Sequence, residues 1–268
     1  MCVLAILYKT AKNTPILVAS NREERIERPT VAPKIQSGTP RVVCGIDQQA
    51  GGTWMGVNQH GMMIAVTNRR KRMPPLDPRS RGLLCRELLS TTNAQDAAQM
   101  AAAELAGGRY DGANYVCADE NYAAVVHGGE KVEIVPLEPG LHTIGNGDLN
   151  DREDPRQQFV RRTLTLHTLD SPVTFLAVAS QAFARKCDSE GRRGVILRDP
   201  GKPTVSATLL ALSNKISRCI MQYAPGPPSD HSYDDLSALL RQVLSTDKSR
   251  KAREAAEEDA DDFDELLD

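Results

Sequence analysis

The chain begins Met1-Cys2-Val3-Leu4-Ala5-Ile6-Leu7-Tyr8, and a second apolar run, residues 15–20, follows the polar connection Thr10-Ala11-Lys12-Asn13-Thr14. Two apolar runs joined by five mostly polar residues are typical of a β-hairpin. We therefore expect strands over residues 2–9 and 15–20. This hairpin is decisive for the fold because it returns the chain to its start, so that residues 19–24 lie close to Cys2.

Cys2 would carry two reactive groups if Met1 is removed, which a small residue at position 2 normally allows. The freed α-amine titrates near pH ~8, so part of it is unprotonated near neutrality. A thiol with a base on the same residue is a nucleophile that carries its own proton acceptor. The alternative is that Cys2 only opens a buried edge strand.

The composition is that of a globular protein: 268 residues, 40% hydrophobic and 25% charged, with a net charge of −2. The charge gives no support for a nucleic-acid partner. Six widely spaced cysteines predict neither a metal site nor a dense disulfide framework, and they suit a reducing compartment. No segment approaches the ~20 apolar residues of a membrane helix, and no signal peptide is recognisable. We expect a cytoplasmic protein without stable membrane insertion.

Further elements follow from apolar periodicity and from glycine and proline breaks. A Pro-rich loop is expected over 28–40. Strands are expected at 41–46, 53–57, 62–67, 114–118, 122–127, 131–136, 141–144, 194–198, 204–212 and 218–223, and helices at 80–90, 94–105, 155–168, 172–186 and 233–244. Runs of strands separated by helix pairs favour an α+β fold, a four-layer αββα sandwich of two antiparallel sheets flanked by helices.

The two ends of the chain differ in character. Residues 1–246 form the expected domain, whereas 247–268 are low in complexity, and residues 254–268 hold nine carboxylates without Lys or Arg. Such a composition predicts a disordered acidic tail.

Two polar groups are candidates for chemistry beside Cys2. The block Asn21-Arg22-Glu23-Glu24 follows the second apolar run, where a guanidinium would favour the thiolate and a carboxylate could hold the amine. Asn68 ends an apolar strand, and an amide donor fixed there could stabilise an oxyanion. The alternatives are a solvated turn for the block and a turn-forming role for Asn68.

Trp54, the single tryptophan, follows Gly51-Gly52. Two flexible glycines before a large ring indicate a tight turn with the ring packed beneath it. Packing is the favoured role, and Trp54 is also a candidate ligand contact.

Together these pieces resemble the NRDE family, also called the transport and Golgi organisation family. The resemblance rests on Met1-Cys2, Asn21-Arg22-Glu23-Glu24, Gly51-Gly52-Thr53-Trp54-Met55-Gly56, Thr67-Asn68, Ile144-Gly145-Asn146-Gly147, Thr204-Val205-Ser206-Ala207-Thr208 and Tyr223-Ala224-Pro225-Gly226. It runs from residue 1 to about residue 245.

That family is similar to N-terminal nucleophile hydrolases of the penicillin acylase and bile salt hydrolase type. The resemblance implies Cys2 as nucleophile and its α-amine as base, with Asn68 as oxyanion donor and Asn146 as a second polar group. Arg22 and Glu24 would flank the thiol, and Asn21 belongs to the same block. The implied reaction is hydrolysis of a linear amide bond in a small acylated substrate, without a cofactor.

Two positions depart from the family pattern. Glu23 stands where the family has Asp, and Val205 stands where a late strand usually carries Arg. A basic residue expected near the site would then have to come from Arg192, Arg193 or Lys202.

The same family suggests a second reading, a non-catalytic carrier of haem or of acyl-CoA and other lipids. The run Arg69-Arg70-Lys71-Arg72, with Arg79 and Arg81, could receive propionates or phosphates; a solvated loop is the alternative. Any haem would be held non-covalently, because there is no Cys-x-x-Cys-His motif.

Overall fold

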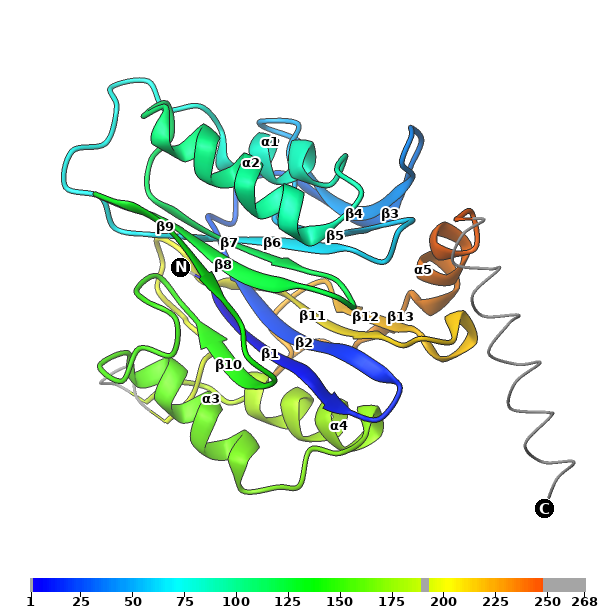
Figure 1. The fold of residues 1–268 in the computed structure, drawn as a ribbon. Coiled ribbons are helices and arrows are strands. Elements are labelled where there is room, and N and C mark those ends of the chain that lie inside the picture. Colours follow the sequence, from blue (N-terminus) through cyan, green and yellow to red (C-terminus); the bar gives the residue numbers. More distant parts are fainter. Residues whose placement is uncertain (1, 189–192, 248–268) are drawn as a thin grey trace, which may run out of the picture.

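The computed structural model describes residues 2–188 and 193–247. The predicted acidic tail lies outside the described residues from 248 onward. Figure 1 shows two β-sheets stacked face to face, with one pair of helices on the outer side of each. The predicted four-layer α+β sandwich is therefore confirmed.

The first sheet has the order β10-β1-β2-β11-β12-β13 and contains the chain start. Its strands are β1 (Val3–Ala11), β2 (Thr14–Glu23), β10 (Gly140–Ile144), β11 (Thr204–Leu212), β12 (Ile220–Ala224) and β13 (Asp234–Asp235). The predicted hairpin is its centre, with Val3 opposite Asn21 and Ile6 opposite Val18.

The second sheet runs in chain order, β3 to β9. Its strands are β3 (Thr30–Gln36), β4 (Val42–Asp47), β5 (Met55–Asn58), β6 (Met63–Asn68), β7 (Ala113–Ala118), β8 (Ala123–Gly128) and β9 (Val132–Pro136). Neighbouring strands in both sheets are antiparallel.

Helices α1 and α2 cover the second sheet, α3 and α4 cover the first, and α5 packs at one end of the sandwich (Figure 1). Their bounds are α1 (Arg81–Leu88), α2 (Ala94–Ala106), α3 (Pro155–Thr165), α4 (Pro172–Phe183) and α5 (Ser237–Leu244), and a 3₁₀ turn spans Ile216–Arg218. None of the helices among the described residues has an apolar stretch long enough to cross a bilayer.

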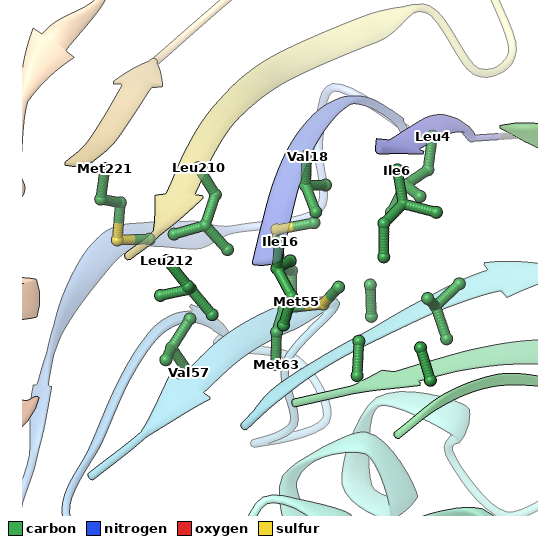
Figure 2. Close-up of a cluster of buried hydrophobic side chains, with 14 of the residues drawn as sticks. Leu4, Ile6, Ile16, Val18, Met55, Val57, Met63, Leu210, Leu212 and Met221 are labelled. Carbon is green, nitrogen blue, oxygen red and sulfur yellow. The ribbon is translucent and has the colours of Figure 1, made fainter. Parts of the chain in front are cut away.

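The core explains why the first two strands are apolar throughout. Alternate residues of β1 and β2, such as Ile6 and Val18, meet Met55 and Met63 of the facing sheet (Figure 2). The residues between them, including Leu17, pack under α3 and α4. A strand buried on both faces needs apolar residues at consecutive positions.

Three element predictions were wrong. The Pro-rich loop contains β3, which tolerates Pro33 because it is an edge strand with a bulge between Val31 and Lys34. Residues 194–198 form one isolated bridge, Ile196 to Lys186, instead of a strand. The last helix starts at Ser237, because Asp234–Asp235 pairs with β12.

Candidate active site

Cys2 lies directly before β1 and lines a cavity of about 290 Å³ between the two sheets. The hairpin register Val3–Asn21, continued by one residue, brings Arg22 opposite Cys2. Six more predicted residues line the same cavity: Arg22, Glu24, Trp54, Asn68, Arg79 and Arg81. The fold thus gathers residues from four parts of the sequence around the thiol.

Arg22 is the main cation on the wall of this cavity. Its side chain is 8% exposed, and its guanidinium lies 4.3 Å from the centroid of the Trp54 ring, an arrangement that stabilises a cation over an aromatic face. Burial lowers its pKa. Among the described residues Arg22 has no side-chain hydrogen bond, so its N–H donors are available to a ligand or to a thiolate.

Room for the Trp54 ring comes from Gly45 on β4. A β-carbon at position 45 would lie 2.2 Å from an atom of the indole ring, closer than any real contact. The sequence gives no signal for this pairing, because Gly45 sits inside an otherwise ordinary strand. The observed role of Trp54 combines packing with a cation contact.

The carboxylate beside the thiol is that of Glu23. Its Oε1 accepts hydrogen bonds from Arg156 Nη2 at 2.7 Å and Thr204 Oγ1 at 3.3 Å, and the residue is 2% exposed. Burial raises the pKa of Glu23 to about 7, against the opposing effect of Arg156. Glu24, predicted for this place, instead lies at the cavity wall 3.9 Å from Arg28.

Burial raises the pKa of the Cys2 thiol, and the nearby Glu23 carboxylate raises it further, while Arg22 lowers it. With Met1 attached, the thiol is therefore held largely protonated. A free α-amine on Cys2 would supply the missing base next to the thiol, and the Glu23 carboxylate could stabilise the ammonium that forms once the amine has taken the thiol proton.

Arg156 provides a guanidinium that sequence reasoning missed. It stands in the first turn of α3, is 133 residues from Glu23 in sequence, and also donates to the Val195 oxygen. Val205, where the family has Arg, falls in a register shift between the Thr204–Glu23 and Ser206–Arg22 pairs.

Two of the three basic residues that could replace the missing arginine, Arg193 and Lys202, lie away from the Cys2 cavity. Arg193 lines a different cavity, beside α3, and Lys202 is exposed. Arg192 lies outside the described residues.

Asn68 and Asn21 differ in where their side chains point. Asn68, at the end of β6, lines the cavity across from the β1–β2 hairpin. The Asn21 amide instead donates to the Phe183 main-chain oxygen at 3.0 Å, under α4. Asn21 therefore anchors β2 to α4 and does not border the cavity.

Asn146 follows β10 in a short turn, residues 145–148. The β1–β10 pair Leu4–Ile144, continued by two residues, would bring Asn146 opposite Cys2. Its Oδ1 is buried and has no hydrogen-bond partner among the described residues. An unpaired buried acceptor is costly, but Asn146 is not among the residues that line the Cys2 cavity.

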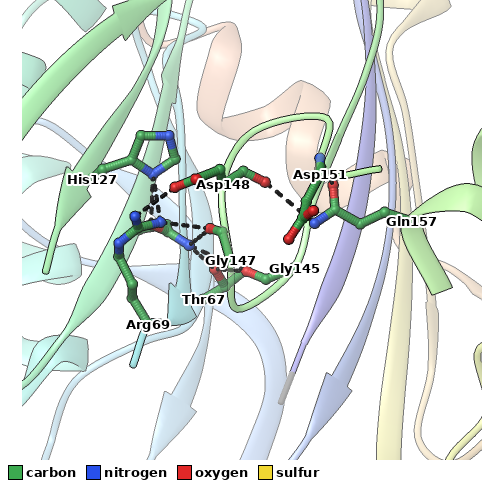
Figure 3. A network of polar contacts seen from close by, with 9 residues as sticks. Thr67, Arg69, His127, Gly145, Gly147, Asp148, Asp151 and Gln157 are labelled. Carbon is green, nitrogen blue, oxygen red and sulfur yellow. Dashed lines mark hydrogen bonds and ion pairs between the residues drawn. The ribbon is translucent and has the colours of Figure 1, made fainter. Parts of the chain in front are cut away.

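A set of polar side chains from the facing sheet, the Asn114 clamp, holds this turn (Figure 3). Asn114 Nδ2 donates to the oxygens of Gly145 (3.2 Å) and Gly147 (3.1 Å), and Thr67 Oγ1 donates to that of Gly145 (2.7 Å). Arg69 donates to the Gly147 oxygen and to Asp148, at 2.7 and 2.5 Å.

His127 completes the clamp from β8. Its Nδ1 lies 2.7 Å from Asn114 Oδ1. Because the Asn114 amide nitrogen is directed at two carbonyl oxygens, its Oδ1 must accept, and His127 therefore carries its proton on Nδ1. Burial lowers the pKa of His127, and the adjacent Arg69 lowers it further.

The predicted ligand-binding arginines are thus used differently. Arg69 is committed to the clamp, and Arg70 is exposed on the loop that follows. Neither lines the Cys2 cavity. Within residues 2–188 and 193–247, no cluster of three or more His, Cys, Asp or Glu side chains is arranged to bind a metal ion.

Comparison with known proteins places these features in context. The family model "Transport and Golgi organisation 2" matches residues 1–181. The mouse and human Transport and Golgi organization 2 homologues are each 27% identical over 158 residues, 54% of this chain and 57% of the relative. The chain thus matches a little over half the length of these curated relatives.

Among solved structures, a Caenorhabditis elegans N-acylethanolamine-hydrolyzing acid amidase orthologue superposes with a TM-score of 0.53 at 13% identity. The match covers 78% of this chain and 92% of that protein. At this identity the likeness shows a shared fold and nothing further.

Proposed function

This chain belongs to the Transport and Golgi organisation 2 family, and we propose that it is an N-terminal cysteine hydrolase that cleaves a linear amide bond in a small acylated substrate. One observation carries the proposal: the Cys2 thiol, the Arg22 guanidinium and the Asn68 amide share one cavity, with buried Glu23 beside the thiol. These are the group types that acyl transfer needs.

In the proposed reaction, the α-amine of Cys2 takes the thiol proton and the thiolate attacks the substrate carbonyl carbon. The Asn68 amide donates a hydrogen bond to the resulting oxyanion. As the C–N bond breaks, the α-ammonium returns its proton to the leaving nitrogen, which departs as an amine. A water molecule, deprotonated by the α-amine, then attacks the thioester carbonyl carbon. The C–S bond breaks, the carboxylic acid leaves, and the α-ammonium returns its proton to the Cys2 thiolate.

The cavity supports a small substrate with a polar part. Its volume of about 290 Å³ is at the lower end for small-molecule sites. Arg28 on its wall is already paired with Asp47 at 2.5 Å, whereas Arg22 retains free donors. We expect a substrate that offers a carbonyl or an anionic oxygen to Arg22.

The second candidate is a carrier that binds haem or an acyl ligand without turnover. The observation in its favour is again Arg22, which could pair with a propionate or phosphate. The described cavity lining contains no histidine, so the Cys2 thiol would be its potential iron ligand.

Intact mass and a substrate screen test the hydrolase proposal. We expect the purified protein to have lost Met1 and to release free acid from at least one member of an N-acyl amide panel. Cys2→Ala should abolish this activity, while Cys187→Ala, at the other partly exposed thiol, should retain it. Retention of Met1, or activity in Cys2→Ala, would refute the mechanism.

Haem titration followed by absorbance separates the carrier from the hydrolase. A saturable spectral change in wild type that Cys2→Ala lacks, together with no turnover of any amide, would favour the carrier.

A further inference from the structure

One exposed loop combines basic and apolar side chains beside the cavity. This basic loop, residues 69–80, joins β6 to α1 and holds five Lys or Arg residues against one acidic residue, Asp77. Its local charge is +4 in a chain whose net charge is −2. Figure 1 shows it as the cyan trace that stands away from the sheets.

The middle of the basic loop presents large apolar side chains to solvent. Met73 is 81% exposed and Leu76 is 107% exposed, that is, fully exposed. Exposed apolar groups of this size are unfavourable in water and commonly mark an interaction site when they cluster. Arg70 and Arg72 directly precede them, are exposed, and take part in no ion pair with any described residue.

The basic loop borders the mouth of the Cys2 cavity. Its last residues, Pro78, Arg79 and Ser80, line the cavity directly. Another exposed apolar residue comes from a different part of the chain. Ile26 is 72% exposed and lies in sequence between Glu24 and Arg28, which also line the cavity. Exposed apolar side chains therefore come from two separate segments, the basic loop and residues 24–28, and the ends of both segments line the cavity.

We propose that the basic loop and Ile26 form a docking surface for an anionic lipid bilayer. Met73, Leu76 and Ile26 would enter the interfacial region, while Arg70 and Arg72 lie among the lipid headgroups. This is the combination by which peripheral proteins bind membranes without spanning them. The cavity would then open toward the bilayer, the source of long-chain acyl compounds.

Charge and shape favour a bilayer over a protein partner. The basic side chains complement anionic headgroups, and the apolar residues stand on convex segments that need no complementary groove. A bilayer accepts such single protruding side chains, whereas a protein interface is normally built around closely packed pockets. The surface goes beyond the proposed reaction, because it would serve a hydrolase or a carrier equally.

Co-sedimentation of the full chain with vesicles tests this surface. We expect binding to mixed phosphatidylserine and phosphatidylcholine vesicles and little binding to phosphatidylcholine alone. Raising the salt from about 0.05 M to about 0.5 M should release the protein, because the screening length shortens. Arg70→Gln with Arg72→Gln should weaken binding roughly tenfold or more.

The molecule offers a matched control for the apolar residues. Leu166 and Val173 lie on the outer layer formed by α3 and α4 and are 81% and 74% exposed. These values match the 81% of Met73 and the 72% of Ile26. Ile26→Ser with Met73→Ser should weaken vesicle binding about tenfold or more. Leu166→Ser with Val173→Ser should change it less than about twofold if the effect is local.

Three results would overturn the proposal: no binding to anionic vesicles, equal losses in both apolar pairs, or binding to poly-glutamate but not to vesicles, which would indicate an acidic protein. Cys2→Ala protein should bind vesicles as wild type does. The outcome is therefore independent of whether any amide is hydrolysed.

Discussion

The Cys2 cavity and the Asn114 clamp lie at the same end of the sandwich and differ in how their polar groups are satisfied. Asn114 uses both ends of its amide, with its nitrogen on two carbonyl oxygens and its oxygen beside His127. The Arg22 side chain, which is 8% exposed, makes no hydrogen bond with any described residue, and burial raises the pKa of Glu23. The polar groups of the clamp stabilise the fold by bonding to one another, whereas the Arg22 guanidinium in the cavity can still bind a ligand.

This difference makes opposite predictions for two asparagines. Asn68→Ala should lower kcat of the proposed hydrolysis about 10²- to 10³-fold, because one oxyanion donor is lost. Its melting temperature should stay close to that of wild type, since the side chain borders the cavity. Steady-state kinetics on any hydrolysed N-acyl amide, with thermal unfolding in parallel, checks both parts. Unchanged kcat would remove Asn68 from the mechanism.

Asn114→Ala should destabilise the protein by about 3 kcal/mol. It leaves the Gly147 oxygen with fewer donors and the His127 Nδ1–H without its acceptor, and buried groups left unpaired cost roughly 1–3 kcal/mol each. Urea unfolding measures the change. Asn121→Ala, at an exposed position, is the control and should stay within about 0.5 kcal/mol. Equal stability of the two variants would show that the clamp is not structural.

The sequence predicted the fold well because its strongest signals are local. Apolar runs at residues 2–9 and 15–20 specify a doubly buried hairpin, and the grouping of strands and helices specifies the layers. It failed at β3, where Pro33 hides an edge strand, since edge pairing depends on a partner strand and a bulge.

The hairpin brings Arg22 to Cys2, whereas Trp54 and Asn68 come to the same cavity through the packing of the two sheets. Arg22, Trp54 and Asn68 reach the cavity as expected. Glu23 points to the other face of β2 from Arg22 and Glu24, where it accepts a hydrogen bond from Arg156, and its carboxylate nevertheless raises the pKa of the Cys2 thiol. Arg156 and Asn114 carry no sequence signal of their roles, which arise only when α3 and β7 pack.

Glu23 makes stability depend on pH in one direction. Its pKa is about 7 when folded and near 4.5 when unfolded, so the native state binds an extra proton between these values. Stability therefore falls as pH rises from about 5 to 8, by roughly 2 kcal/mol. In Glu23→Gln this part of the pH dependence should disappear, even if the substitution also changes the free energy of unfolding by an amount that does not depend on pH. Parallel curves for the two proteins would contradict the raised pKa.

His127 should act in the opposite direction and more weakly. Burial and Arg69 lower its pKa in the folded state, although Asp148 and Glu133 partly oppose this. The unfolded state then binds the extra proton, so stability falls as pH drops below about 6.5. His127→Gln keeps an amide donor for Asn114 and should flatten this acid limb, whereas His167→Gln, at an exposed position, should not. Denaturation curves from pH 5 to 8 would therefore assign the loss of unfolding free energy at high pH to Glu23 in the cavity and the loss at low pH to His127 in the clamp. If the loss at low pH persists in His127→Gln, it does not arise from His127.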